Sequence, residues 1–321
     1  MREQAQRRLD SLAKPPGSLG RLETLAVQLC EISGSCPPPM PSPVEVYVFA
    51  GDHGVLAQGV SPWPQSVTAA MVRTFAMGGA AVNALARQVG ADVVVVDVGV
   101  AEPVEGALDR NVRRGTADLS VGAAMSADEA AQAFAVGRSL GAASSAGLLV
   151  TGDMGIGNTT PSACVIAALT GRPGDDVTGR GTGIDDAALE VKTRIVADAA
   201  DRVRGADAMT VLAEVGGLEI AAIAGLVTGS RVPVVVDGVI ALAGLLVAAT
   251  LDPSVLLRVI AGHRSPEPGA TVVLDHLGLE PLLDLGMRLG EGTGALLAVP
   301  IVQSAARIIT EMATLSDVLG T

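Results

Sequence analysis

The segment RLGEGTGALLAVP, residues 288–300, carries a single carboxylate, Glu291, between two glycines and ahead of a long apolar run. A carboxylate in apolar surroundings loses hydration, which raises its pKa and makes it a stronger base near neutral pH. The flanking glycines would let a substrate approach without steric conflict. Glu291 is therefore a candidate general base. An exposed glutamate favoured by the dipole of the following helix is an equally good interpretation from these residues alone.

A second segment, TGDMGIGNTTPSA (residues 151–163), has the composition of a strand end, a glycine turn and a helix start. Asn158, Thr159 or Thr160 could cap that helix, and the following proline suits its first turn. Backbone N–H groups at such a turn can bind a phosphate group without much basic charge. An ordinary strand-to-helix turn is the simpler explanation of the glycines alone. The segment is not the dinucleotide-binding fingerprint, because the third glycine is absent.

Two further segments could complete an anion site. GRGTGIDDAALEVK (residues 179–192) is another glycine loop ahead of a helix, and it ends in Lys192. Taken alone, Lys192 is most simply a solvated surface lysine. AGHRSPEPG (residues 261–269) ends a predicted strand and offers the Ser265 hydroxyl together with two side chains able to bind anions.

The pair Asp52 and His53 in FAGDHGV begins like the acid and base of a hydrolase triad. No serine or cysteine belongs to a recognisable nucleophile motif, so a triad is not expected. The next stretch, GVSPWPQSVT (residues 59–68), holds the only tryptophan, Trp63, between prolines. An aromatic side chain there could belong to the core or form the wall of a site for a flat ligand.

The elements that must position these residues follow a repeating unit: a short β-branched run, a glycine-bearing turn and an alanine-rich helical segment. The runs lie at residues 44–51, 92–99, 147–153, 232–238 and 254–263. Strands that alternate with helices predict right-handed βαβ units and a parallel sheet, hence an α/β fold. Ligands of such sheets bind beyond the carboxyl ends of the strands. The polar residues expected there are Asp52, His53, Asp153, Asp237, His263, Arg264 and Ser265, and Glu291 has an equivalent place ahead of the last helix.

The composition agrees with this fold. Of the 321 residues 49% are hydrophobic, but only five are aromatic, so the core must consist of Ala, Val, Leu and Ile. Such a core is typical of helices packed on a buried parallel sheet. The net charge of −12, without any basic run, argues against nucleic acid or anionic lipid as a partner. The longest uncharged apolar run, residues 239–251, is too short to cross a bilayer, so we expect no membrane span and a buried helix instead.

The cysteines and histidines indicate neither disulfides nor a metal site. Cys30, Cys36 and Cys164 are odd in number and lack metal-ligand spacing. Reduced thiols in the cytoplasm are the favoured interpretation, and the first residues of the chain do not have the apolar core of a signal peptide. The three histidines are too scattered for a zinc site. We therefore expect no metal and no cofactor.

Several segments occur in the order found in one known family. They are KPPGSLGRLE, AGDHGV, GDMGIGNTT, EVGGLEIAA, VVVDG, GHRSPEPG and RLGEGTGALLAVP. From Lys14 into the last helix, the chain resembles the nicotinate-nucleotide–dimethylbenzimidazole phosphoribosyltransferases, and KPPGSLGRLE and RLGEGTGA are the most specific matches. The resemblance implies an enzyme of cobalamin biosynthesis that moves 5-phosphoribose from nicotinate mononucleotide to 5,6-dimethylbenzimidazole. The products would be α-ribazole 5′-phosphate and nicotinate.

The same resemblance implies an architecture. The family has a Rossmann-like α/β domain and a small helical domain built from both chain ends, usually as a cytoplasmic homodimer. Here we expect a helical segment and linker at residues 1–43, a Rossmann-like substrate-binding domain at residues 44–292, and a C-terminal helical segment at residues 293–321 that joins the first.

The resemblance also implies roles for single residues. Glu291, in the LGEG motif, matches the general base that takes a proton from the acceptor. The positions expected to bind substrate are Asp153, Met154, Gly155, Gly157, Asn158, Thr159, Thr160, Gly179, Lys192, Ser265, Leu289, Ser61, Trp63 and Met71. The glycine turns would hold the donor phosphate through backbone N–H groups, with Ser265 and Lys192 as side-chain contacts.

Three positions depart from the family pattern. Asp153 stands where the family usually has glutamate, so the charge is retained and the reach is shorter. Met71 stands where some relatives carry a glutamine that faces the base, and Trp63 stands near a serine position of those relatives. These departures leave open which lower-ligand base is the acceptor.

Two other classes of protein are alternatives. A catalytically silent nucleotide-binding homologue would keep the glycine turns and would not need Glu291. A nicotinamide-dependent oxidoreductase would need the dinucleotide fingerprint, which this sequence lacks.

Overall fold

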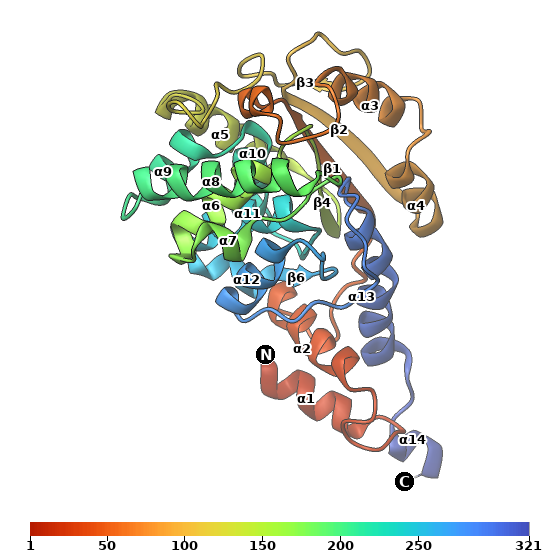
Figure 1. Cartoon of the computed structure of the whole chain (residues 1–321). Helices are drawn as coiled ribbons and strands as arrows, with labels where there is room; N and C mark the ends of the chain where they lie inside the picture. The colour runs from red at the N-terminus through yellow and green to blue at the C-terminus, as the bar shows by residue number, and fades with distance from the viewer. Residues whose placement is uncertain (321) are drawn as a thin grey trace.

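The centre of the molecule is a six-stranded parallel sheet with helices on both faces (Figure 1). A computed structural model describes residues 1–320, so Thr321, the last residue of the predicted C-terminal segment, lies outside the described residues. The strands are β1 (Val44–Gly51), β2 (Ala91–Gly99), β3 (Leu108–Asp109), β4 (Leu148–Met154), β5 (Val234–Val236) and β6 (Val259–Ala261). Their order in the sheet is β3-β2-β1-β4-β5-β6, which is the order of the Rossmann fold. The predicted α/β class is confirmed.

The predicted strands agree with the sheet where the runs are long. The run at residues 44–51 coincides with β1, and those at residues 92–99 and 147–153 match β2 and β4 to within one residue. Only the middle of the run at residues 232–238 forms β5. The run at residues 254–263 is wrong in its first half, because a 3₁₀ helix, η2 (Pro253–Arg258), precedes β6. Asp252 caps η2 by accepting a hydrogen bond from the amide of Ser254.

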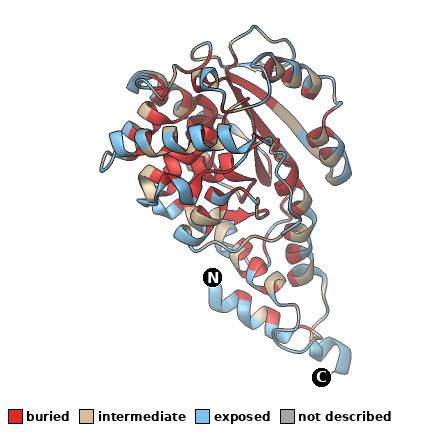
Figure 2. Ribbon diagram, viewed as in Figure 1, coloured by how far each residue is buried: buried red, intermediate tan, exposed pale blue. Residues whose placement is uncertain are grey.

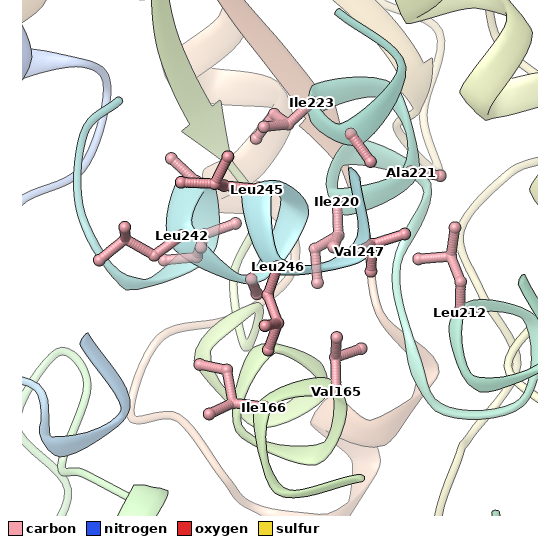
Figure 3. Close-up of a cluster of buried hydrophobic side chains, with 14 of the residues drawn as sticks. Val165, Ile166, Leu212, Ile220, Ala221, Ile223, Leu242, Leu245, Leu246 and Val247 are labelled. Atoms are coloured by element: carbon pink, nitrogen blue, oxygen red, sulfur yellow. The ribbon is translucent and has the colours of Figure 1, made fainter. Parts of the chain in front are cut away.

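One face of the sheet is covered by apolar helices whose side chains form a large core. These helices are α5 (Ala127–Ala143), α6 (Thr159–Thr170), α7 (Gly174–Val177), α8 (Asp186–Arg202), α9 (Ala208–Val215), α10 (Leu218–Gly229), α11 (Val239–Leu251) and α12 (Pro268–Leu277). Figure 3 shows part of this core, where aliphatic side chains of α6, α9, α10 and α11 gather. The apolar run at residues 239–251 is α11, and it is buried as predicted.

The other face is covered by α3 (Ser66–Ala76), α4 (Ala81–Val89), α13 (Thr293–Glu311) and α2 (Arg21–Ser33). Strand β1 shows how both faces are filled. Tyr47 and Phe49 belong to the first core, and Val46 and Val48 belong to the second, because successive side chains of a strand point to opposite faces. The sheet is therefore buried on both sides, as Figure 2 shows by the red strands at the centre.

The two ends of the chain lie together at the bottom of the view in Figure 1. Helix α1 (Arg2–Ser11) and helix α2 pack near the far end of α13, and α14 (Leu315–Leu319) follows α13. The amide of Ala13 donates a hydrogen bond to the carbonyl of Ala313 over 2.9 Å. In the KPPGSLGRLE motif, Lys14 Nζ lies 2.8 Å from Glu23 Oε1, and both side chains are nearly buried. This ion pair joins the first and last residues of the motif, which connects α1 to α2.

Two stretches, residues 66–89 and Thr293–Glu311, are long and apolar enough to cross a membrane by length and composition. In the fold the first stretch is two helices, α3 and α4, separated by a turn at residues 77–80. The second is α13, which packs against α2 and α4. Of the tested windows, 39% and 56% of the residues are buried inside the protein.

Candidate active site

A cavity of about 340 Å³ lies beyond the carboxyl ends of β4, β5 and β6. Such a volume suits a small organic ligand. Ten of the predicted site residues line it: Trp63, Met71, Asp153, Met154, Gly155, Asn158, Thr159, Ser265, Leu289 and Glu291. Five of the predicted residues are not part of the lining: Ser61, Gly157, Thr160, Gly179 and Lys192. The structure therefore brings together residues more than 200 positions apart in the chain.

Glu291 lies at the edge of this cavity in an unusual conformation. Its φ of 64° makes it the single non-glycine residue with positive φ within residues 1–320, and glycines with positive φ stand on both sides. The Glu291 side chain is buried, so its alternative interpretation as an exposed helix-end glutamate is wrong. Oε2 accepts a hydrogen bond from the amide of Val82 over 3.2 Å, in the first turn of α4.

Three influences set the pKa of Glu291. Burial raises the pKa above that of an ordinary glutamate, the amide of Val82 opposes this, and the negative charge of Asp237 raises the pKa further. The result is a carboxylate that accepts protons more readily than a solvated one. This is the property expected of a general base near neutral pH.

The glycines around Glu291 allow its backbone to lie against the sheet. A Cβ atom at Gly152, in β4, would lie 2.7 Å from the carbonyl oxygen of Glu291. Any side chain at this position would push the loop away from β4. Gly152 is therefore needed for close approach of two backbones rather than for a special φ angle.

Asp153 follows Gly152 and is also buried. Its Oδ2 accepts a hydrogen bond from Asn158 Nδ2 over 2.9 Å, and its Oδ1 has no hydrogen-bond partner. Burial raises the pKa of Asp153 well above its ordinary value, and the negative charges of Asp237 and Glu219 add to the effect. Asn158, one of the three predicted caps, occupies the N-cap position of α6. Its side chain bonds to Asp153 and makes no capping hydrogen bond.

Lys192 is fully buried, so the interpretation of Lys192 as a solvated surface lysine is wrong. Its Nζ donates hydrogen bonds to Thr159 Oγ1 and to the carbonyl of Gly179, each over 2.8 Å. Burial lowers the pKa of Lys192 to about 8, although the nearby carboxylate of Glu267 acts in the opposite direction. Since Thr159 lines the cavity, the ammonium group lies directly behind the cavity wall.

Comparison with known proteins assigns the chain to a family. The family model described as Phosphoribosyltransferase matches residues 1–318. A nicotinate-nucleotide–dimethylbenzimidazole phosphoribosyltransferase of Salinispora tropica is 53% identical, over 94% of this chain and 90% of the relative. One from Chloroflexus aurantiacus is 51% identical, over 98% of this chain and 92% of the relative.

The chain belongs to the nicotinate-nucleotide–dimethylbenzimidazole phosphoribosyltransferase family. The structure agrees, because the crystal structure of CobT from Thermus thermophilus superposes with a TM-score of 0.96 and is 45% identical, over 99% of this chain and 98% of that one. The resemblance noted in the sequence is confirmed. Membership of this family supports a transferase over an oxidoreductase or a catalytically silent homologue.

Part of the cavity lining is apolar. Trp63 is 53% exposed and lines the cavity, so its interpretation as a core residue is wrong. Met71 lines the cavity from α3 and also packs against the core beneath. Val67 and Ile240 extend the same apolar lining.

Several lining residues are not among the predicted substrate-binding residues. They include His263, Glu267 and Arg288. Glu267 Oε1 accepts a hydrogen bond from the amide of Gly181, and Arg288 Nη1 donates one to the carbonyl of Gly181. The motifs GHRSPEPG and RLGEGTGA contain these three residues, so the motifs are the signal that could have found them.

The Asp52–His53 pair does not line the cavity. His53 Nε2 lies 3.0 Å from Glu219 Oε1, and both side chains are fully buried. Burial disfavours the imidazolium, but the Glu219 carboxylate and the charge of Asp52 together raise the pKa of His53. Within residues 1–320, no group of three or more His, Cys, Asp or Glu side chains is placed to hold a metal ion.

Proposed function

We propose that this chain transfers 5-phosphoribose from nicotinate mononucleotide to 5,6-dimethylbenzimidazole, giving α-ribazole 5′-phosphate and nicotinate in cobalamin biosynthesis. The observation that carries this proposal is the buried carboxylate of Glu291 beside a cavity with an apolar wall. The names of its relatives, at about half sequence identity over nearly the whole chain, support the same substrates.

In the proposed reaction, one ring nitrogen of dimethylbenzimidazole attacks the anomeric carbon from the face opposite the nicotinate. The carbon–nitrogen bond of the donor breaks, and its electrons stay on the departing ring, which becomes neutral at nitrogen. Configuration at the anomeric carbon is inverted. As the attacking nitrogen gains positive charge, the N–H of the other ring nitrogen becomes acidic, and Glu291 takes that proton. The raised pKa of Glu291 favours this transfer.

For the donor phosphate we propose the amides near Gly155, Gly157 and Gly179, with Ser265 and Lys192 as side-chain contacts. The turn that begins at Gly155 leads into the N-terminus of α6, where the helix dipole favours an anion. Lys192 adds a positive charge behind Thr159. Asp153, Met154, Asn158, Thr159, Thr160, Leu289 and Ser61 complete the proposed substrate-binding set.

For the acceptor we propose the apolar wall that contains Trp63 and Met71. Dimethylbenzimidazole is flat and apolar except for its two ring nitrogens, so its methylated edge gains most from leaving water. The large, polarisable side chains at these two positions supply the matching surface.

A direct assay tests the proposal. Purified protein is incubated with nicotinate mononucleotide and dimethylbenzimidazole, and α-ribazole 5′-phosphate is sought by chromatography and mass spectrometry. Proton NMR of the product distinguishes the α from the β anomer. Reactions without protein, or without either substrate, serve as controls. A protein that binds the donor and forms no α-ribazole phosphate would contradict the proposal.

We further propose a cytoplasmic homodimer without a membrane span. Three free cysteines agree with a reducing compartment. We also propose that residues 1–43 and 293–321 form one small helical domain beside a larger domain at residues 44–292. Hydrogen bonds from Arg8 to the carbonyls of Ile309 and Met312 support the pairing of the two ends. Light scattering of the purified protein tests the dimer, and cell fractionation tests the location.

A further inference from the structure

The carboxylate of Asp237, at the end of β5, has no part in the reaction proposed above. Its side chain is 1% exposed and does not line the cavity. Oδ1 accepts a hydrogen bond from the amide of Ala295 over 2.9 Å, and Oδ2 accepts one from the amide of Gly292 over 3.2 Å. Both amides belong to the start of α13, directly after Glu291. Asp237 therefore fixes the beginning of this helix as a capping carboxylate does, but from a distant part of the chain.

The backbone at residues 290–292, next to the helix start that Asp237 caps, has an unfavourable conformation. Glu291 has a φ of 64°, and Gly290 and Gly292 on either side also have positive φ. A glutamate persists in the left-handed region only where its surroundings enforce it. Here Gly152 allows β4 to press against the carbonyl of Glu291, and Asp237 holds the following amide. The backbone of the proposed base is thus packed against β4 at its carbonyl and fixed by Asp237 through the next amide.

Asp237 is itself fixed by the sheet. Its amide donates a hydrogen bond to Thr151 Oγ1 of β4 over 3.1 Å. His263, at the end of β6, has its Nε2 3.4 Å from Asp237 Oδ1. A Cβ atom at Gly294 would lie 2.1 Å from the ring of His263, so α13 begins in close contact with this imidazole. Contacts with residues at the ends of β4, β5 and β6 thus fix the start of α13 and the adjacent Glu291.

Asp237 also places a negative charge beside the base. Both its oxygens accept hydrogen bonds from backbone amides at the start of α13. The other ionisable groups that line the cavity with Glu291 are Asp153, His263, Glu267 and Arg288. On α4, Arg87 donates a hydrogen bond to the carbonyl of Gly78. The Arg288 guanidinium donates to the carbonyl of Gly181 instead of pairing with Glu291. The charge of Asp237 raises the pKa of Glu291, after burial and against the Val82 amide.

We propose that Asp237 is a positioning residue for the general base: it fixes the backbone of Glu291 through the first turn of α13 and places a second negative charge beside its carboxylate. This inference rests on the proposed role of Glu291. It assigns no contact between Asp237 and either substrate.

The test compares Asp237→Asn and Asp237→Ser with the wild type, using kcat as a function of pH. Both variants keep an oxygen that can accept a hydrogen bond at the helix start, and both lose the charge. We expect kcat per folded molecule to fall by about tenfold or more, because small displacements of a catalytic group have large effects on rate. We expect KM for nicotinate mononucleotide to stay within about twofold, since no donor contact is removed. The acid limb of the profile should move to lower pH, because Glu291 ionises more easily once the neighbouring charge is gone.

Asp207→Asn is the matched control. Asp207 caps α9 by accepting hydrogen bonds from the amides of Met209 and Thr210, and it is not part of the cavity lining. Its variant should keep the wild-type acid limb and the wild-type kcat. A purely structural role for Asp237 would lower the folded fraction and leave the acid limb in place. Should Asp237→Asn fail to fold, Asp237→Ser gives the same comparison.

The outcomes separate this inference from the proposed function. If Glu291→Gln keeps its turnover, Glu291 is not the base, and both ideas fall. If Glu291→Gln loses turnover and the folded Asp237 variants keep both kcat and the wild-type acid limb, only the inference about Asp237 is overturned. Loss of turnover in Glu291→Gln together with a shifted acid limb in the Asp237 variants supports both.

Discussion

The backbone amide of Val82 donates a hydrogen bond to Oε2 of Glu291 across 3.2 Å, although the two residues are 209 positions apart. Val82 lies in the first turn of α4, where amides are free of partners within the helix. One oxygen of the carboxylate is therefore oriented by a helix terminus on the far side of the loop. This contact opposes the effect of burial on the pKa of Glu291 and helps to keep the ionised form accessible.

Glu291→Gln should fold normally and lose most of its turnover. The amide keeps the shape of the side chain and removes the proton acceptor, and loss of a general base typically costs about 10²–10⁴-fold in rate. Burial disfavours the charge of Glu291 above its raised pKa, so the neutral glutamine should leave Tm unchanged or higher near neutral pH. Initial rates at saturating substrates and a thermal melt measure both effects.

Glu311→Gln is the control on the same helix. Glu311 pairs with Arg307 at the exposed end of α13. Its variant should turn over at the wild-type rate. Near-wild-type turnover in Glu291→Gln would instead leave Glu291 without a catalytic role.

Gly152→Ala should misplace the base without removing it. The new Cβ would lie 2.7 Å from the carbonyl oxygen of Glu291, so the loop must move away from β4. We expect a loss of about 1–3 kcal/mol in the free energy of unfolding and a fall of about 10²-fold in kcat. Urea unfolding and steady-state kinetics provide the two measurements. Gly122→Ala is the control, because a Cβ at Gly122 has no neighbour within 4 Å. An active, stable Gly152→Ala enzyme would show that the loop tolerates displacement.

Lys192→Met should weaken binding of nicotinate mononucleotide. Loss of a charged hydrogen-bond donor costs about 1.5–3 kcal/mol, or about 10- to 100-fold in Kd. Burial lowers the pKa of Lys192 to about 8. As pH rises through this value the free enzyme loses the positive charge, so Kd for the donor should rise above about pH 8 in the wild type. In the Met variant this pH dependence should disappear.

Isothermal titration at several pH values measures this Kd, and Arg194→Met is the control. Arg194 projects from the same helix, α8, into solvent, where it pairs with Glu190. Its variant should bind the donor like the wild type at every pH. Equal losses in both variants would show that Lys192 acts only through the general charge of the surface.

Met71→Gln should weaken selection for dimethylbenzimidazole over benzimidazole. The two methyl groups lose an apolar partner, and each buried methyl contributes about 0.8 kcal/mol, so the preference should fall by up to about tenfold. Affinity for nicotinate mononucleotide should be nearly unchanged. The ratio of kcat/KM for the two bases is the measurement. Met77→Gln, at the exposed end of the same helix, is the control. An unchanged ratio, or an equal loss of donor binding, would place Met71 outside the acceptor site.

The sequence by itself determined the fold class and predicted candidate residues for the chemistry. Long β-branched runs predict β1, β2 and β4 closely, because seven to nine residues show a clear pattern. Short elements cannot be predicted from periodicity in this way. The two residues of β3 show no periodicity, and the apolar residues of η2 resemble the start of a strand. Glu291 is predictable as a candidate because its two glycine neighbours and the apolar run after it are properties of a short stretch.

Only the tertiary structure decided how these residues act together. The burial of Lys192, the turn of Asn158 toward Asp153 and the hold of Asp237 on α13 depend on elements far apart in the chain. Local periodicity records which face of an element is apolar, and it does not record which partner covers that face. The pKa of a carboxylate likewise depends on its distance from other charges and from water. The sequence motif therefore identifies Glu291 as the candidate base. Its raised pKa depends on burial, on the amide of Val82 and on the charge of Asp237, which only the tertiary structure brings together.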